Sequence, residues 1–476
     1  MNTEKVLAFF REITRIPRES GHEELIVEYL KKFAQDRSLE YKVDKANNVV
    51  IFKEASKGFE DRPTIVLQSH SDMVCEKLAG SSFDFSKDPI VYEVENGWMM
   101  ARETTLGADD GIGIACSLAL MDDETIEHPR LECLFTTSEE TGLDGARALK
   151  KGFFTGKRLI NLDNEDEGQF CVGCAGGMDT IATFTYKEKK LLPGSVVTRF
   201  SIGGGIGGHS GEDIGKNRMN AVQQIARFVN EAFEFKVDIC EIAAGNKRNA
   251  IARSGHAVLA IPARSEDAVV AVFNRIASEI KSEYAITDPD IFFSAEPVEW
   301  KKGAIDSRTA HNLVRSLLCV PHGVMAMSAD IPGLVETSTN LASVAMSHDN
   351  RIVVGTMQRS SVNSARLFIG SRVGAAFENA GASVRQTDGY PGWKPNMNSE
   401  IKDIFVDAYH RLFNSEPDVC AIHAGLECGL FTDKFPGMDM IAVGPTLKGV
   451  HAPGERLDLV SLDKFWMLLL EVLKTA

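Results

Sequence analysis

A short apolar strand that ends in polar side chains is encoded by Thr64-Ile65-Val66-Leu67-Gln68-Ser69-His70-Ser71-Asp72. In an extended chain His70 and Asp72 lie two residues apart and therefore on the same side. An imidazole can bind a metal ion, and a carboxylate beside it can orient the ring or assist a base. A single histidine after a strand is more often structural, so this stretch alone predicts a strand with a candidate polar site at its end.

Helical and strand patterns alternate around this stretch. Apolar residues recur at helical spacing from Glu4 to about Gln35, interrupted at Pro17 and Gly21, which predicts two helices. Short β-branched runs predict strands at 41–43, 48–52, 64–67, 132–135 and 158–162, with a Gly/Ala-rich helix at 111–121 among them. Alternating strands and helices indicate an α/β fold with a mostly parallel central sheet.

Two changes of pattern suggest how the chain divides into domains. The charged run 187–190 followed by Leu191-Leu192-Pro193-Gly194 marks a boundary, although a solvated hairpin loop explains it equally well. Beyond it follow the patterns of an α+β module, and after the turn-rich run 389–395 the first pattern resumes. We therefore predict a catalytic domain formed by residues 1–185 and 391–476, with an α+β lid and dimerisation domain, residues 186–390, inserted between them.

The composition is that of a soluble multi-domain enzyme. The 476 residues are too many for one core, and 44% are hydrophobic while 25% are charged. The excess of 67 acidic over 52 basic side chains gives a net charge of −15, which argues against nucleic acid or a membrane surface as the partner. The sequence shows neither a signal-peptide pattern nor a long apolar stretch, so we expect a cytoplasmic protein.

The nine cysteines indicate reduced thiols rather than a disulfide framework, because they are scattered through apolar segments. The one close pair, Cys171-x-x-Cys174, lacks a second pair at zinc-finger spacing and is followed by Gly176-Gly177. We interpret it as a tight connection between strands.

Further acidic clusters and a histidine stand where predicted strands end or a helix begins. They are Asp109-Asp110, Glu139-Glu140, Asp163 and His451. Open α/β sheets bind ligands at the carboxyl ends of their strands, although Asp109 and Asp110 could simply cap a helix. Adjacent carboxylates point in different directions, so one of Glu139 and Glu140 can bind a metal ion while the other moves a proton. Together with His70 these nitrogen and oxygen donors suit a pair of Zn²⁺, Mn²⁺ or Co²⁺ ions.

The sequence closely resembles the M20 family of di-metal peptidases, essentially from end to end. The motifs that carry the resemblance are Ile13-Thr14-Arg15-Ile16-Pro17-Arg18, His70-Ser71-Asp72, Thr105-Leu106-Gly107-Ala108-Asp109, Ser138-Glu139-Glu140-Thr141-Gly142, Gly173-Cys174-Ala175-Gly176-Gly177, Gly208-His209-Ser210-Gly211, His423-Ala424-Gly425-Leu426-Glu427-Cys428-Gly429 and His451-Ala452-Pro453-Gly454-Glu455.

The resemblance implies a set of metal ligands. His70, Asp109 and Asp163 would hold one ion. Asp109, Glu140 and His451 would hold the other, so that Asp109 bridges the pair. Zinc is the first expectation for both ions, with manganese or cobalt as alternatives.

The resemblance also implies roles in the reaction. Glu139 would be the general base and acid, with Asp72 as its supporting partner. His209 in the lid would polarise the scissile carbonyl, and Glu427 would receive the substrate's free amino group. Asp110 departs from the family pattern, in which close relatives carry Asn or another uncharged residue, so metal affinity or pH profile can differ here.

The implied activity is the hydrolysis of dipeptides with a free amino terminus, including Xaa-His dipeptides such as β-alanyl-histidine, by water activated between the two ions. In dimeric relatives the histidine that matches His209 reaches the neighbouring protomer's site, so the resemblance implies a homodimer. An M20-type amidohydrolase acting on N-acyl amino acids is the alternative, which Glu427 disfavours because a carboxylate selects an ammonium group. A binding or structural protein would need a disrupted metal set, whereas all the implied ligands are present.

Overall fold

The computed structural model describes residues 3–476, which form two compact units. Unit 1 contains the chain up to Cys174 together with Trp393–Ala421 and Leu426–Ala476, and unit 2 contains Ala175–Gly392 and Ile422–Gly425. The chain passes into unit 2 before residue 185, because the strand that follows Cys174 already belongs to the sheet of unit 2. The roles of the two units as catalytic domain and lid stay predictions.

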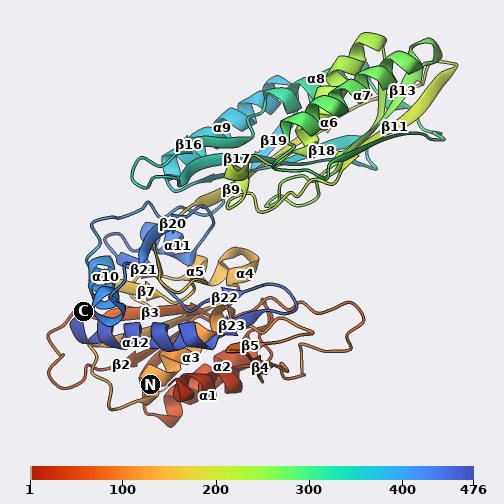
Figure 1. The fold of residues 1–476 in the computed structure, drawn as a ribbon. Coiled ribbons are helices and arrows are strands. Elements are labelled where there is room, and N and C mark those ends of the chain that lie inside the picture. Colours follow the sequence, from red (N-terminus) through yellow and green to blue (C-terminus); the bar gives the residue numbers. More distant parts are fainter. Residues whose placement is uncertain (1–2) are drawn as a thin grey trace. The chain divides into compact units, whose positions relative to one another are not determined.

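Unit 1 is built on an eight-stranded sheet with the order β1-β2-β6-β3-β7-β21-β8-β20 (Figure 1). In that order the strands are Tyr41–Val43, Val49–Lys53, Leu131–Thr136, Ile65–His70, Arg158–Asn161, Asp439–Ala442, Gln169–Cys174 and Asp418–Ile422. The central strands β6, β3, β7 and β21 run parallel, and β2 and β8 flank them in the antiparallel direction. Every residue of β2, β3 and β6 is buried, as in a sheet covered on both faces. This confirms the predicted α/β class.

Helices and a small second sheet complete unit 1. The helices are α1 (Glu4–Ile13), α2 (Glu24–Asp36), α3 (Ala108–Asp122), α4 (Glu139–Gly142), α5 (Asp144–Ala148), α10 (Glu400–Phe413), α11 (Glu427–Lys434) and α12 (Leu459–Thr475). The small sheet has the order β22 (Leu447–Lys448), β23 (Arg456–Asp458), β5 (Trp98–Met100) and β4 (Glu93–Glu95). All of α3 from residue 108 to 121 is buried, where its Gly and Ala residues allow close packing against α1 and β3.

Unit 2 is built on a nine-stranded antiparallel sheet with helices along one face (Figure 1). Its order is β14 (Phe292–Pro297), β11 (Ser195–Gly203), β13 (Gly255–Pro262), β12 (Asp238–Ala244), β17 (Val335–Ser347), β18 (Arg351–Ser360), β9 (Gly176–Thr185) and β19 (Ser383–Gln386), with β16 (Gly323–Met327) beside β17 and a separate pair of β10 (Glu188–Lys189) and β15 (Ala304–Ile305). The helices are α6 (Ala221–Ala232), α7 (Glu266–Glu283), α8 (Ser307–Cys319) and α9 (Asn363–Asn379), and single 3₁₀ turns lie at Ile214–Lys216, Phe233–Phe235 and Ala263–Ser265. Asn220 begins α6 by accepting hydrogen bonds from the N–H groups of Val222 and Gln223.

Across residues 3–476, no helix has the length and apolar character that a membrane span requires.

Candidate metal centre

The carboxyl ends of neighbouring parallel strands carry most of the predicted metal ligands. His70 is the last residue of β3, Glu139 and Glu140 follow β6, and Asp163 follows β7. His451 lies farther along, between β22 and β23. Because β6, β3, β7 and β21 are adjacent and parallel, these strands end at one edge of the sheet. The topology therefore brings together side chains that are far apart in the sequence.

Asp109, near the start of α3, lies between the two histidines. Its Oδ1 is 2.9 Å from His70 Nε2, and its Oδ2 is 3.0 Å from His451 Nε2. Asp163 Oδ1 lies 3.5 Å from the same nitrogen of His70, and Glu140 Oε1 lies 2.9 Å from that of His451. Donor atoms of His70, Asp109 and Glu140 also lie within 4.8 Å of one another, so Asp109 is close to ligands on both of its sides. The five side chains thus form two groups that share Asp109.

The charge of this cluster fits a bound cation. Burial raises the pKa of Glu139 and of Asp163 well above the usual range, and nearby carboxylates raise both further although His70 opposes them. Carboxylates in such a site are costly unless they are paired or coordinate a metal. The donors are carboxylate oxygens and imidazole nitrogens, which suit zinc, manganese or cobalt. The residues therefore fit a bound divalent cation.

Asp72 contacts both His70 and the turn formed by Glu139 and Glu140. Its Oδ1 lies 3.3 Å from His70 Nδ1, and its two oxygens accept the backbone N–H groups of Glu139 at 3.1 Å and Glu140 at 3.2 Å. The hydroxyl of Ser20 donates to Oδ2 at 2.7 Å. Burial raises the pKa of Asp72, but these contacts outweigh burial and lower the pKa to about 2. The ionised carboxylate can therefore orient the imidazole and hold the turn.

Glu427, the first residue of α11, has one carboxylate oxygen satisfied and one open. Its Oε2 accepts hydrogen bonds from Gln68 Nε2 at 2.6 Å and Thr136 Oγ1 at 2.8 Å. Within the described chain no donor reaches Oε1, and the side chain is fully buried. Burial raises the pKa of Glu427 to about 7. An open buried oxygen of this kind suits a cationic group of a ligand.

Gln68 and Thr136 were not identified from the sequence as site residues. Both are polar side chains near the ends of apolar strands, β3 and β6. Buried polar side chains need hydrogen-bond partners, so a polar residue within an apolar strand was the sequence feature that could have indicated Gln68 and Thr136 as site residues.

Asp110 has a different environment from its neighbour Asp109. Its Oδ1 accepts the N–H of Gly113 at 3.1 Å, and its Oδ2 has no hydrogen-bond partner among residues 3–476. Burial raises the pKa of Asp110 to about 8, and the charge of Asp109 adds to the shift. The peptide bond that joins the two residues is cis.

His209 lies in unit 2, in the glycine-rich segment before the 3₁₀ turn Ile214–Lys216. Its Nε2 is 3.2 Å from Arg359 Nη2, and its backbone N–H donates to Asp213 Oδ2 at 2.7 Å. Burial and the positive charge of Arg359 lower the pKa of His209 to about 4, so the imidazole is neutral at pH 7. Gly208 has φ +117°, and a Cβ there would overlap the Asp213 carboxylate. The glycine is therefore required by this conformation.

Arg359, on β18, was missed by the sequence analysis. It is 3% exposed and donates to Ser210 Oγ at 3.2 Å and to Tyr390 OH at 2.9 Å. None of the described carboxylates forms an ion pair with it. A buried guanidinium without a carboxylate partner is suited to bind an anionic group of a ligand. The sequence carries no signal for this role, because the burial of Gln358, Arg359 and Ser360 at the end of β18 is visible only in the structure.

The sequence pair Cys171-x-x-Cys174 is not the close pair in space. Cys171 Sγ lies 3.4 Å from Cys420 Sγ on the neighbouring strand β20, whereas Cys174 Sγ approaches the carbonyl oxygen of Leu426. All nine cysteines are free. Strand β8 ends at Cys174 and β9 begins at Gly176, which is the tight strand connection that the sequence predicted.

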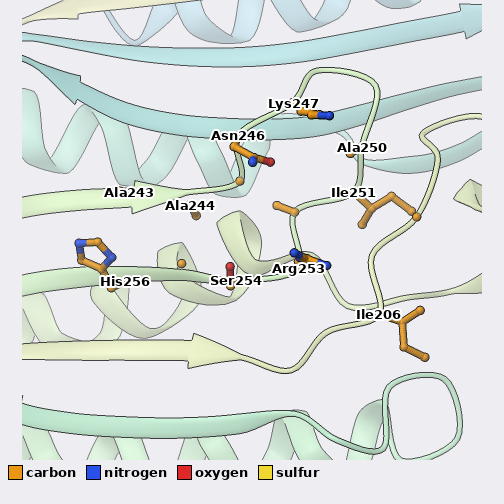
Figure 2. Close-up of a pocket in the computed structure, with 14 residues that line it drawn as sticks. Ile206, Ala243, Ala244, Asn246, Lys247, Ala250, Ile251, Arg253, Ser254 and His256 are labelled. Atoms are coloured by element: carbon orange, nitrogen blue, oxygen red, sulfur yellow. The ribbon is translucent and has the colours of Figure 1, made fainter. Parts of the chain in front are cut away.

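A cavity of about 530 Å³ is lined by residues of unit 2 alone. Figure 2 shows it between the end of β12 and the start of β13, with Asn246, Lys247, Arg253 and His256 among the lining side chains. No carboxylate belongs to this lining. The cavity therefore lacks the donor set of the cluster around Asp109.

Comparisons with known proteins agree on one family. Residues 66–475 match the model of peptidase family M20/M25/M40. The chain is 36% identical to the cytosol non-specific dipeptidase of Escherichia coli K12 over 466 residues, which are 98% of this chain and 96% of that protein. The crystal structure of aminoacylhistidine dipeptidase from Vibrio alginolyticus matches with a TM-score of 0.90 at 36% identity, covering 99% of this chain and 96% of the other. The aminopeptidase PepT of Bacillus cereus matches with a TM-score of 0.60 at 16% identity, over 100% and 98% of the two chains, which shows a shared fold.

Proposed function

The chain belongs to peptidase family M20/M25/M40 and is a metallo-dipeptidase, and we propose that it hydrolyses dipeptides that carry a free amino terminus. The proposed substrates include Xaa-His dipeptides such as β-alanyl-histidine and other, less specific dipeptides. The names of the two relatives at 36% identity support this breadth. The observation that carries the proposal is the placement of Asp109 between His70 and His451.

The proposed ligands follow the two groups of the cluster. His70, Asp109 and Asp163 would hold one divalent ion, and Asp109, Glu140 and His451 the other. Zinc is proposed for both, with manganese or cobalt as alternatives that the same donors accept. When bound, such ions supply Lewis acidity, which lowers the pKa of water and polarises a carbonyl group.

Glu139 is the proposed general base and acid. Burial raises the pKa of Glu139 well above its usual range, and neighbouring carboxylates raise it further, which makes the carboxylate a stronger base. It would take the proton of the attacking water and deliver it to the leaving amine. Asp72 fixes the start of this turn through the backbone N–H of Glu139, which limits how far the carboxylate can move.

The remaining groups would recognise the substrate. The open oxygen of Glu427 is proposed to receive the ammonium group, and the neutral His209 to donate a hydrogen bond to the carbonyl oxygen. We further propose a cytoplasmic homodimer in which His209 serves the partner's site, on the strength of the family resemblance.

N-acetylation of the substrate is expected to reduce hydrolysis by about 100-fold or more. An acetylated amine carries no charge and leaves Glu427 unpaired in a closed site, which costs roughly 3 kcal/mol. The measurement compares kcat/KM for β-alanyl-histidine and for its N-acetylated form on the same preparation. In Glu427→Gln the rate on the free dipeptide should fall far more than the rate on the acetylated one. Equal rates on both substrates in the unaltered enzyme would instead favour the amidohydrolase alternative.

A further inference from the structure

Two buried charged side chains, Glu455 and Arg18, hold the loop that carries Asp109. We propose that both are positioning residues, which keep Asp109 placed to receive metal between His70 and His451. This inference rests on the proposed metal centre. It concerns residues that touch none of the candidate ligand atoms and that act through the backbone.

The carboxylate of Glu455 accepts the backbone N–H groups of four consecutive residues. Its Oε2 accepts those of Leu106 at 2.8 Å and Gly107 at 3.1 Å, and its Oε1 accepts those of Ala108 at 2.8 Å and Asp109 at 3.3 Å. The side chain is 2% exposed, so water does not compete for these bonds. Asp109 and Asp110 have non-helical backbone angles, so the N–H groups that precede the regular part of α3 need acceptors from outside the helix. A single side chain therefore fixes the entry to α3.

Arg18 binds the carbonyl groups of the same region. It donates through Nη1 to the carbonyl oxygens of Asp72 at 2.6 Å and Ser71 at 3.3 Å, and through Nη2 to that of Gly107. Gly107 has φ +70°, and a Cβ there would lie 2.6 Å from Arg18 Nη2. Glycine thus lets the guanidinium reach the backbone. Arg18 is itself 2% exposed.

The two side chains join the segments that carry the candidate ligands. Glu455 stands four residues after His451 and is 349 residues from Leu106, so it ties the His451 segment to the Asp109 loop. Arg18 ties the same loop to the segment of His70 and Asp72. No local structure can fix the spacing of segments so far apart in the chain. Metal ligands need placement to within about 0.5 Å, and loss of their supporting partners typically weakens metal binding about 10–100-fold.

Glu132 offers a matched control for Glu455. It is also a fully buried carboxylate of unit 1 that accepts backbone N–H groups, those of Thr155 at 2.6 Å and Gly156 at 2.9 Å. Its backbone pairs with Val66 of β3, but its carboxylate contacts only Arg130, Thr155 and Gly156 among the described residues, so the side chain reaches neither His70, Asp109 nor His451. If Glu455 has a purely structural role, Glu455→Gln and Glu132→Gln should change Zn²⁺ affinity to the same extent. If Glu455 positions Asp109, only Glu455→Gln should weaken Zn²⁺ binding.

The experiment strips metal from the full-length wild-type chain and its variants and titrates Zn²⁺ against a chelating indicator. Glu455→Gln is expected to bind Zn²⁺ about 10–100-fold more weakly than the wild type and to change the visible absorption spectrum of bound Co²⁺. Glu132→Gln is expected to keep the wild-type affinity and spectrum even if its melting temperature falls. Wild-type affinity and spectrum in Glu455→Gln, or equal weakening in both variants, would overturn the inference.

A second variant decides the matter if Glu455→Gln does not fold. Arg18→Lys keeps the charge but loses the forked pair of donors, so it cannot serve the carbonyls of Asp72 and Gly107 together. It is expected to weaken Zn²⁺ binding about tenfold, and unchanged affinity in it would refute the positioning role. A wild-type chain that binds no Zn²⁺ would contradict the metal centre itself, which distinguishes the two failures.

Discussion

Glu139→Gln is expected to lower kcat for dipeptide hydrolysis by about 10²–10⁴-fold while the chain keeps two metal ions. An amide cannot accept the proton of the attacking water, so the chemical step loses its base. Within residues 3–476 neither His70 nor His451 forms a hydrogen bond or ion pair with Glu139, whereas Glu140 Oε1 lies 2.9 Å from His451 Nε2. Metal content is measured by inductively coupled plasma mass spectrometry on the preparation used for kinetics. This measurement separates a loss of catalysis from a loss of bound metal.

Glu140→Gln is the matched variant, because it makes the same chemical change one residue along the chain. It should lose metal as well as activity, since a carboxylate that faces His451 would be removed from the ligand set. Substantial activity in Glu139→Gln would move the general base to another residue. Full metal content in Glu140→Gln would remove Glu140 from the ligands.

Mixed dimers are expected to recover activity that neither parent has. His209→Ala and Glu139→Ala should each be nearly inactive, because every site then lacks one of the two groups. If His209 serves the partner's site, a heterodimer contains one site with both groups intact. With random pairing half of the dimers are heterodimers, so a co-refolded mixture should reach roughly a quarter of wild-type activity.

The control for this experiment is proof that subunits have exchanged. Two differently tagged wild-type preparations, treated in the same way, should yield doubly tagged dimers. An absence of recovered activity despite such exchange would mean that His209 acts within its own chain or has no role in the reaction.

Strands β2, β3, β6 and β7 of the central sheet were predicted because buried strands have continuous apolar sequences, whereas no strand was predicted at β8 or β20. The run that ends at His70 forms β3, all of it buried, and the run before Glu139 forms β6. The rule that ligands gather at the carboxyl ends of parallel strands, joined to the family resemblance, then selected the side chains that the structure groups around Asp109. Local pattern and topology were sufficient for this part.

The supporting contacts could not be predicted, because they bind backbone groups or join distant segments. Glu455 accepts N–H groups nearly 350 residues away, and a backbone N–H has no signature in the sequence. The same holds for Arg18 and the carbonyl of Gly107. The return of Ile422–Gly425 to unit 2 is likewise set by tertiary contacts rather than by composition.

Removal and return of metal tests the central claim, that this cluster is a metal centre for dipeptide hydrolysis. The chain is stripped with a chelator, and hydrolysis of β-alanyl-histidine and a panel of other dipeptides is measured before and after separate addition of Zn²⁺, Mn²⁺ or Co²⁺. We expect the stripped chain to be inactive, and activity to return with at least one of these ions and to saturate near two ions per chain. Undiminished hydrolysis by the fully stripped chain would contradict the account.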